Sequence, residues 1–249
     1  MSGRARTHWG DGRRPQGVAA AKPLPRRAVL ADDVYEAIKA LIMDHEIEPD
    51  ARVSIDGLAR QLRVSPTPVR EALARLESAE LVAKEPLRGY RATPLLTKEE
   101  LEDLYQFRLL IEPWAAARAA ERVAAGDKEQ LRAEMAATEV PQSDSYAEYK
   151  ALTAHDTRLH VLIAELAGSP QVRHAFERTH CHLHIFRLHY HRTIGAETIK
   201  EHQAIVDAIT QGDKDAAEHA MRRHLESSCY DRLLPLYDAG GRRRHDERS

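Results

Sequence analysis

Two neighbouring stretches between residues 53 and 78 have the periodicity of short amphipathic helices. Apolar side chains recur in each at the i, i+3, i+4, i+7 spacing of a helix that buries one face. They are Ile55, Leu58, Ala59 and Leu62 in the first stretch, and Val69, Ala72, Leu73 and Leu76 in the second. Between them, Ser65 suits the N-cap of the second helix and Pro66 suits its first position, where a missing N–H costs nothing. The pattern predicts a helix-turn-helix, whose second helix places its N-terminal residues in the DNA major groove. The alternative is an amphipathic helical hairpin with a solvated basic face.

The flanking residues complete a small domain. An amphipathic helix is predicted over residues 31–46, and residues 81–84 and 90–93 are short strand candidates joined by a turn. Gly89 permits positive φ in that turn, and Arg88 would lie at the tip of a two-stranded wing. We therefore expect a winged helix-turn-helix of three helices and two strands over residues 30–94.

Residues 97–237 contain helical patterns without a strand pattern. Thr97 and Glu100 form a capping box at the start of the first helix. Glycine and proline then divide the region into helices predicted over residues 98–125, 127–138, 145–167, 171–193, 195–211 and 213–237. The fold class is therefore mainly α: a winged helix-turn-helix followed by an antiparallel bundle of six to seven helices.

Charge and composition favour a DNA-binding protein over a secreted or membrane protein. Residues 1–96 carry 16 Lys and Arg against 13 Asp and Glu, whereas the rest of the chain carries 21 against 26. A basic front part next to an acidic remainder fits DNA binding at one end. Two cysteines are too few for a disulfide framework, and no apolar run approaches the roughly 20 residues of a membrane span, so we expect a cytoplasmic protein. Residues 1–29 read as a disordered basic arm and residues 238–249 as a basic tail.

Residues 34–93 resemble the winged helix-turn-helix of the GntR family of bacterial transcription regulators. The resemblance rests on Leu58-Ala59, on VSPTPVREALARLESAELV over residues 64–82, on Pro86 and on Arg88-Gly89-Tyr90. It implies DNA contacts from the start of the second helix and from the wing, carried over to Ser65, Thr67, Arg70, Arg88 and Gly89. Pro66 departs from the family pattern, in which an arginine is common, so one DNA contact is expected to be lost there.

Four polar residues interrupt the apolar stripes of the predicted bundle. Asp156 and His160 are spaced i, i+4 and share a helix face with Leu152, Leu159 and Ile163, while His202 and His224 lie on apolar stripes of two later helices. A buried polar group without a partner costs about 1–3 kcal/mol, so each of the four needs a partner. A divalent ion of the Zn, Ni or Mn class would satisfy all four. The alternative is that each histidine is bonded to a backbone carbonyl, the usual fate of a buried imidazole.

Residues 97–236 resemble the FCD ligand-binding domain, named for the C-terminal domain of the fatty-acid regulator. The matching segments are FRLLIEPWAAARAA (107–120), DTRLHVLIAELAGS (156–169), EHQAIVDAITQGD (201–213) and AMRRHLE (220–226). The resemblance implies that Asp156, His160, His202 and His224 are the metal ligands. It also implies a small carboxylate effector at or beside the metal, for which the always-charged guanidinium of Arg108 is a plausible partner.

The segment HAFERTHCHLHIFRLHYH, residues 174–191, is unusually rich in histidine. A second metal site that uses His180, His184 and His191 is one interpretation. Glu177-x-x-His180 resembles half of a di-iron motif, but that motif needs two such pairs and two further Glu, and the segment has one pair. We expect instead that Arg187 and some of these histidines line the effector cavity.

Together these patterns predict a ligand-responsive transcription regulator. It would bind a palindromic DNA operator as a homodimer, and as a repressor it would respond to a small organic acid. A helical metalloenzyme that uses the Asp/His site is the first alternative, although a catalytic zinc usually keeps three protein ligands. A bundle that serves only for dimerisation is the second.

Overall fold

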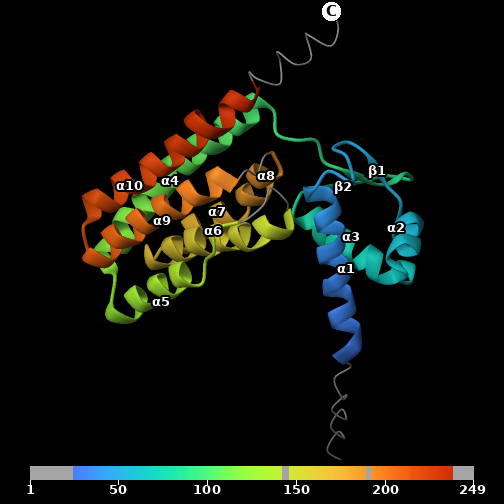
Figure 1. Ribbon diagram of the computed structural model, residues 1–249, viewed down its shortest axis with the longest axis horizontal. Coiled ribbons are helices and arrows are strands. Elements are labelled where there is room, and N and C mark those ends of the chain that lie inside the picture. Colours follow the sequence, from blue (N-terminus) through green and yellow to red (C-terminus); the bar gives the residue numbers. More distant parts are fainter. Residues whose placement is uncertain (1–24, 142–145, 189–191, 238–249) are drawn as a thin grey trace, which may run out of the picture.

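The computed structural model describes residues 25–141, 146–188 and 192–237, and these form a small front domain and a larger helical bundle (Figure 1). The predicted basic tail and all but the last residues of the predicted basic arm lie outside these residues. The first helix, α1 (Pro25–Met43), begins six residues before the predicted start, so residues 25–29 belong to this helix rather than to an arm. No helix in the described part of the chain is long and apolar enough to cross a membrane.

The front domain is a winged helix-turn-helix. It comprises α1, β1 (Arg52–Val53), α2 (Ile55–Leu62), α3 (Pro66–Ser78), β2 (Val82–Glu85) and β3 (Gly89–Ala92). The strands pair antiparallel in the order β1-β3-β2, with Val82 opposite Ala92 and Val53 opposite Tyr90. The sheet thus has one strand more than expected, because two residues are too few to show a period-2 pattern in the sequence. The apolar stripes of the three helices meet in one core, which includes Ile38, Leu73 and Leu76.

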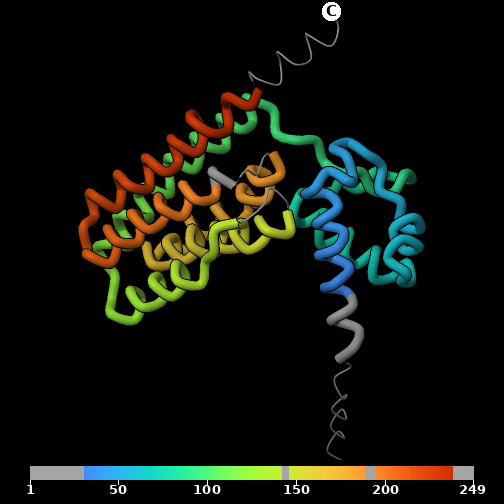
Figure 2. The backbone as a smooth tube through the Cα atoms, viewed as in Figure 1, coloured from blue at the N-terminus to red at the C-terminus, as the bar shows by residue number. Residues whose placement is uncertain are grey.

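The second domain is an all-α bundle. Its helices are α4 (Lys98–Arg122), α5 (Ala125–Ala136), α6 (Tyr146–Leu166), α7 (Pro170–Glu177), α8 (Cys181–Leu188), α9 (Arg192–Gln211) and α10 (Lys214–Glu226), which continues into a π-helical segment, Ser227–Leu233. The capping box at Thr97 is present: Glu100 N–H donates to Thr97 Oγ1, and Thr97 N–H donates to a carboxylate oxygen of Glu100. The tube in Figure 2 shows α4, α9 and α10 running side by side along the bundle.

The helix predicted over residues 171–193 is wrong, because the structure divides it into α7 and α8. His180 has φ +44 between them, a left-handed conformation that a continuous helix cannot contain. The break lets α8 turn toward the front domain, next to which it lies in Figure 1.

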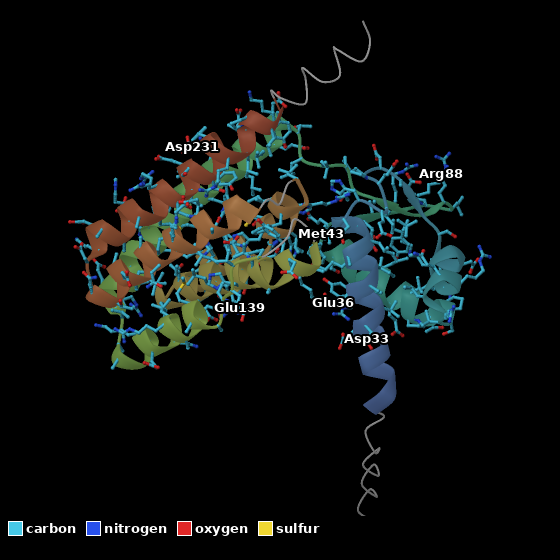
Figure 3. All side chains as sticks on the ribbon, viewed as in Figure 1. Asp33, Glu36, Met43, Arg88, Glu139 and Asp231 are labelled. Carbon is cyan, nitrogen blue, oxygen red and sulfur yellow. The ribbon has the colours of Figure 1, made fainter. Side chains whose placement is uncertain are left out.

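The two domains meet in a small apolar cluster. It combines the end of α1 with α6 and α8 through Met43, Tyr146, Tyr149, Leu152 and Phe186. Figure 3 shows Met43 at this junction. The linker that joins the domains, residues 93–97, runs from β3 to the start of α4.

Candidate metal centre and nucleic-acid interface

Four side chains from three helices converge inside the bundle. Asp156 and His160 come from α6, His202 from α9 and His224 from α10, and all four are buried. One ligand atom from each lies within 4.8 Å of the others. The residues that the FCD resemblance selected from distant parts of the sequence are thus neighbours in space.

The outward-facing nitrogens of two of these histidines are held by carboxylates. Nδ1 of His160 donates to Glu112 of α4, and Nδ1 of His224 donates to Oε2 of Glu201 at 2.8 Å. A neutral imidazole carries one proton, so a proton on Nδ1 leaves Nε2 with a free lone pair. This is the arrangement by which outer carboxylates fix the tautomer of a metal-binding histidine.

His202 is held through a second histidine. Nδ1 of His155 has two neighbours, Glu134 Oε1 at 2.8 Å and Thr138 Oγ1 at 2.7 Å. The Thr138 hydroxyl donates to the Glu134 carbonyl, so both neighbours can only accept and Nδ1 of His155 carries the proton. Nε2 of His155 then accepts from Nδ1 of His202 at 3.0 Å, which leaves Nε2 of His202 unprotonated.

Electron pairs therefore face one another at the centre of the cluster. Nε2 of His202 lies 3.0 Å from Oδ1 of Asp156, and Nε2 of His160 lies 3.9 Å from the same oxygen. None of these three buried atoms has a hydrogen-bond partner among the described residues. Two acceptors cannot bond to each other, and a buried acceptor without a partner is costly. A cation between them would satisfy all three, so the donor set fits a divalent metal ion.

The ionisation of the site agrees with this donor set. Burial lowers the pKa of His202 to about 3 despite the opposing effect of Asp156, so the ring is neutral and ready to ligate. Burial alone would raise the pKa of Asp156, but the neighbouring His182 opposes this effect, and the pKa stays well below its usual value, so the carboxyl is ionised. Glu201 behaves in the same way, since hydrogen bonds from His224 and Arg232 lower its pKa to about 2 against the effect of burial.

A cavity of about 30 Å³ adjoins the cluster. Its lining includes Arg108, Asp156 and His224 together with Tyr105, Thr198, Ser228 and Arg232. Arg108 is buried and donates through Nε to Glu112 at 2.6 Å, while its Nη2 lies 3.2 Å from Nε2 of His182. The expected inward position of Arg108 is thus present, although part of its guanidinium is already bonded to the protein.

Arg187, the other expected effector contact, lies elsewhere. Its guanidinium donates to Thr93 Oγ1 at 2.9 Å and to the Thr93 carbonyl at 2.7 Å, at the start of the interdomain linker. It does not line the cavity beside the Asp/His cluster. Because α8 turns at His180, this side chain faces the front domain rather than the interior of the bundle.

The histidine-rich stretch does not gather into a second metal cluster within the described residues, where the Asp156 group is the one candidate. His180 precedes α8 and His184 lies within it, so they are not on one regular helix, and His191 lies outside the described residues. His182, which the spacing argument did not single out, is the member that reaches the site, with Nε2 3.0 Å from Asp156 Oδ2.

Sequence reasoning missed the residues that orient the ligands. Glu112, Glu134 and His155 are polar residues with no motif of their own, although each lies on a helix that faces the cluster. Glu201 and His155 directly precede ligands in the chain, and Glu112 follows the inward-facing Arg108 by one helical turn. These positions next to a ligand or an inward-facing residue were the only sequence signal for their role.

The start of α3 is free to contact DNA. Ser65, Thr67 and Arg70 are all exposed there. Ser65 occupies the N-cap position, as predicted, but its hydroxyl makes no capping hydrogen bond. Pro66 and Pro68 remove two of the three N–H groups in the first turn, so the hydroxyl has few local donors and stays available for another partner.

The wing offers a second exposed contact. Arg88 lies in the β2–β3 turn and Gly89, with φ +88, begins β3; both are exposed, and Leu87 beside them is fully exposed. Figure 3 shows Arg88 at the end of the front domain that is remote from the bundle. Both predicted DNA contacts of the wing are therefore accessible to solvent.

Comparison with known proteins identifies both domains. Residues 30–91 match the model of the bacterial regulatory proteins of the gntR family, and residues 103–227 match the FCD domain. The putative L-lactate dehydrogenase operon regulatory protein of Escherichia coli is 31% identical over 238 residues, which cover 81% of this chain and 85% of that protein. The chain belongs to the GntR family. This GntR protein is therefore a transcription regulator with an FCD domain, and its relatives are regulators rather than enzymes.

Two solved structures share its fold. McbR/YncC of E. coli aligns with a TM-score of 0.62 over 84% of this chain and 98% of that chain, at 22% identity. A GntR regulator of Rhodococcus sp. RHA1 aligns with a TM-score of 0.58 over 83% of this chain and 98% of that chain, also at 22% identity. The order of a winged helix-turn-helix and a helical bundle is thus shared along nearly the whole length of both structures.

Proposed function

We propose that this GntR regulator is a metal-dependent repressor in the bacterial cytoplasm, and that a homodimer binds a palindromic operator and responds to a small carboxylate effector. The observation that carries the proposal is the convergence of unprotonated Nε2 atoms of His160 and His202 on Oδ1 of Asp156. Such an arrangement is costly without a cation.

The proposed ligands of the ion are Asp156, His160, His202 and His224. Three imidazoles and one carboxylate suit ions of the Zn, Ni or Mn class. When bound, the ion would act as a Lewis acid that attracts the carboxylate of the effector. The outer residues Glu112, His155 and Glu201 orient the imidazoles and hold a proton on each Nδ1, so that Nε2 faces the ion.

The proposed effector site is the small cavity between the metal ligands and Arg108. Nη2 of Arg108 and the hydroxyl of Ser228 offer polar groups there, and the volume of about 30 Å³ favours a compact ligand. A relative named as the regulator of an L-lactate dehydrogenase operon supports a small hydroxy acid as the chemical class. The two cationic groups, Arg108 and Arg232, would favour an anion.

The proposed dimer uses the exposed face of α4. Leu110 and Trp114 are 78% and 44% exposed and lie one helical turn apart, so they form an apolar patch that a second copy could bury.

We expect Trp114→Glu to convert the dimer into a monomer at micromolar concentration, measured by light scattering after size exclusion. Ala133→Glu, an exposed site on α5, should leave the mass unchanged. A dimeric mass for Trp114→Glu and Leu110→Glu would assign the interface elsewhere.

DNA binding tests the proposal as a whole. We expect the zinc-loaded full chain to bind the region upstream of its own gene at least about 10³-fold more tightly than random duplex, with an affinity that falls as salt rises. Fluorescence anisotropy with a random-sequence competitor measures both. Equal affinity for the two duplexes would refute the operator, and addition of L-lactate or related hydroxy acids then tests release.

A further inference from the structure

Helix α8 lies between the Asp/His cluster and the front domain, and its two sides contact different parts of the protein. Toward the bundle, Nε2 of His182 lies 3.0 Å from Asp156 Oδ2 and 3.2 Å from Arg108 Nη2. Toward the front domain, Leu183 packs against the core of the winged helix, and Phe186 joins the junction cluster with Met43. Leu183, Phe186 and Arg187 are spaced i, i+3, i+4, which is why they share one face.

Arg187 attaches this helix to the linker. Its side chain is 1% exposed, and its guanidinium binds the side chain and the carbonyl of Thr93, with a longer contact of 3.5 Å to the Pro94 carbonyl. The backbone carbonyl of Arg187 accepts in addition from Nε2 of His45, in the loop after α1, at 2.9 Å. One residue of α8 therefore holds both the linker and the end of α1.

Thr93 in turn forms hydrogen bonds with the winged helix-turn-helix. Its hydroxyl donates to the Glu80 carbonyl at 2.8 Å, and its N–H donates to the Leu81 carbonyl at 3.1 Å. Glu80 and Leu81 form the turn that directly follows α3, the helix with the exposed DNA-binding residues. Direct polar contacts thus connect Asp156 to His182, Arg187 to Thr93, and Thr93 to the turn after α3. The backbone of α8 connects His182 to Arg187.

Hydrogen bonds to neutral oxygens hold the guanidinium of Arg187, without an ion pair among the described residues. No carboxylate in the described part of the chain pairs with Arg187, and its Nε is buried without a partner. Burial of an unpaired cation opposes its charge and lowers the pKa of Arg187 to about 10. The neutral oxygens of Thr93 and Pro94 compensate only part of that cost.

We infer that α8 is the element that couples the Asp/His site to the DNA-binding domain, with His182 as the contact at the site and Arg187 as the clamp on the linker. The inference rests on the proposed metal site, since a ligand at Asp156 Oδ1 acts on the carboxylate whose other oxygen faces His182. A bound ion would shift that carboxylate, and α8 would transmit the shift to Thr93. Allostery requires such differential contacts in two states.

Hydrogen–deuterium exchange of the full chain, with and without Zn²⁺, tests the inference. In the wild type we expect Zn²⁺ to slow exchange in α6, α9 and α10 and to change exchange in residues 79–96 by at least about 5-fold, the lower end of typical allosteric coupling. Arg187→Gln should keep the response of the bundle and lose that of residues 79–96. Arg187→Lys should give the same result, because an ammonium cannot bind both acceptors of Thr93 as a planar fork does. Arg132→Gln, an exposed arginine on α5, is the matched control and should keep both responses.

The outcomes separate the inference from the proposed function. A response of the bundle without any response of residues 79–96 in the wild type would overturn the coupling alone. A full response of residues 79–96 in both Arg187 variants would overturn it as well. Absence of any response in the bundle would overturn the metal site, and the coupling with it.

Discussion

Asp156→Asn is expected to weaken Zn²⁺ binding by at least about 100-fold and to leave the metal-free protein as stable as the wild type or more stable. The loss follows because a neutral amide is a poor ligand for a divalent cation, and even residues that only support the ligands typically contribute 10–100-fold. The retained stability follows from the electron pairs at the centre of the site. The side-chain amide of this variant could donate to the lone pair on Nε2 of His202, which lies 3.0 Å from Asp156 Oδ1 in the wild type.

Competition with a chromophoric chelator measures the affinity, and thermal unfolding in EDTA measures the stability. Saturating Zn²⁺ at about 100 times its dissociation constant should add about 2.7 kcal/mol to the wild type, which raises Tm by roughly 5–10 °C. The variant should show no such rise. Asp207→Asn, an exposed carboxylate on the same helix as His202, is the control and should behave as the wild type.

The opposite pattern would support a purely structural cluster. If Asp156 served only to bind His182 and its neighbours, the amide would remove a buried charge interaction, and the metal-free variant would melt well below the wild type. Zinc would then leave both proteins unchanged. The two measurements together therefore distinguish a metal site from a bundle that serves only for dimerisation.

Regular spacing made much of this protein predictable. The i, i+4 relation of Asp156 and His160 places both on one side of α6, and their apolar neighbours Leu159 and Ile163 show that this side is buried. The apolar stripes also marked His202 and His224 as buried, but only the FCD resemblance assigned all four residues to one site, because the sequence alone does not say which helices are neighbours. The capping box at Thr97 and the prolines at the start of α3 marked the helix starts for the same local reason.

The sequence did not predict which part of the protein each side chain of α8 would face. Arg187 and His182 are five residues apart on one short helix, yet one binds the linker and the other reaches Asp156. The break at His180 sets both directions, and a left-handed histidine has no sequence signal comparable to that of glycine. The strand β1 and the orienting carboxylate Glu112 were missed because each acquires its role only through a distant partner.

Two arginines of the helix-turn-helix also differ in a way that the sequence does not reveal. Counting charges treats Arg70 and Arg75 of α3 as equivalent. In the structure, Arg75 binds Asp32 of α1 at 2.6 Å and lies 4.1 Å from the ring centre of Tyr35. Arg70 is exposed, and its side chain makes no hydrogen bond or ion pair with any other described residue. Arg75 therefore holds α3 against α1, and Arg70 is the one free to contact DNA.

Arg70→Ala is expected to cost about 1–3 kcal/mol of operator binding for each half-site, or roughly 5–150-fold, because a single arginine contact to a base edge or phosphate has that value. Arg75→Ala should change operator affinity by less than about threefold and lower the stability by at most about 1 kcal/mol, the usual range for an exposed ion pair. Anisotropy titrations over a range of salt concentrations measure the first effect, and urea unfolding measures the second. If Arg70 contacts a phosphate, the slope of log affinity against log salt should fall by about one for each half-site, whereas a contact to guanine should relax sequence preference at one position. An equal loss of DNA binding in both variants, with unchanged stability, would show that the two arginines face the DNA together and that the contact between Arg75 and Asp32 does not persist in solution.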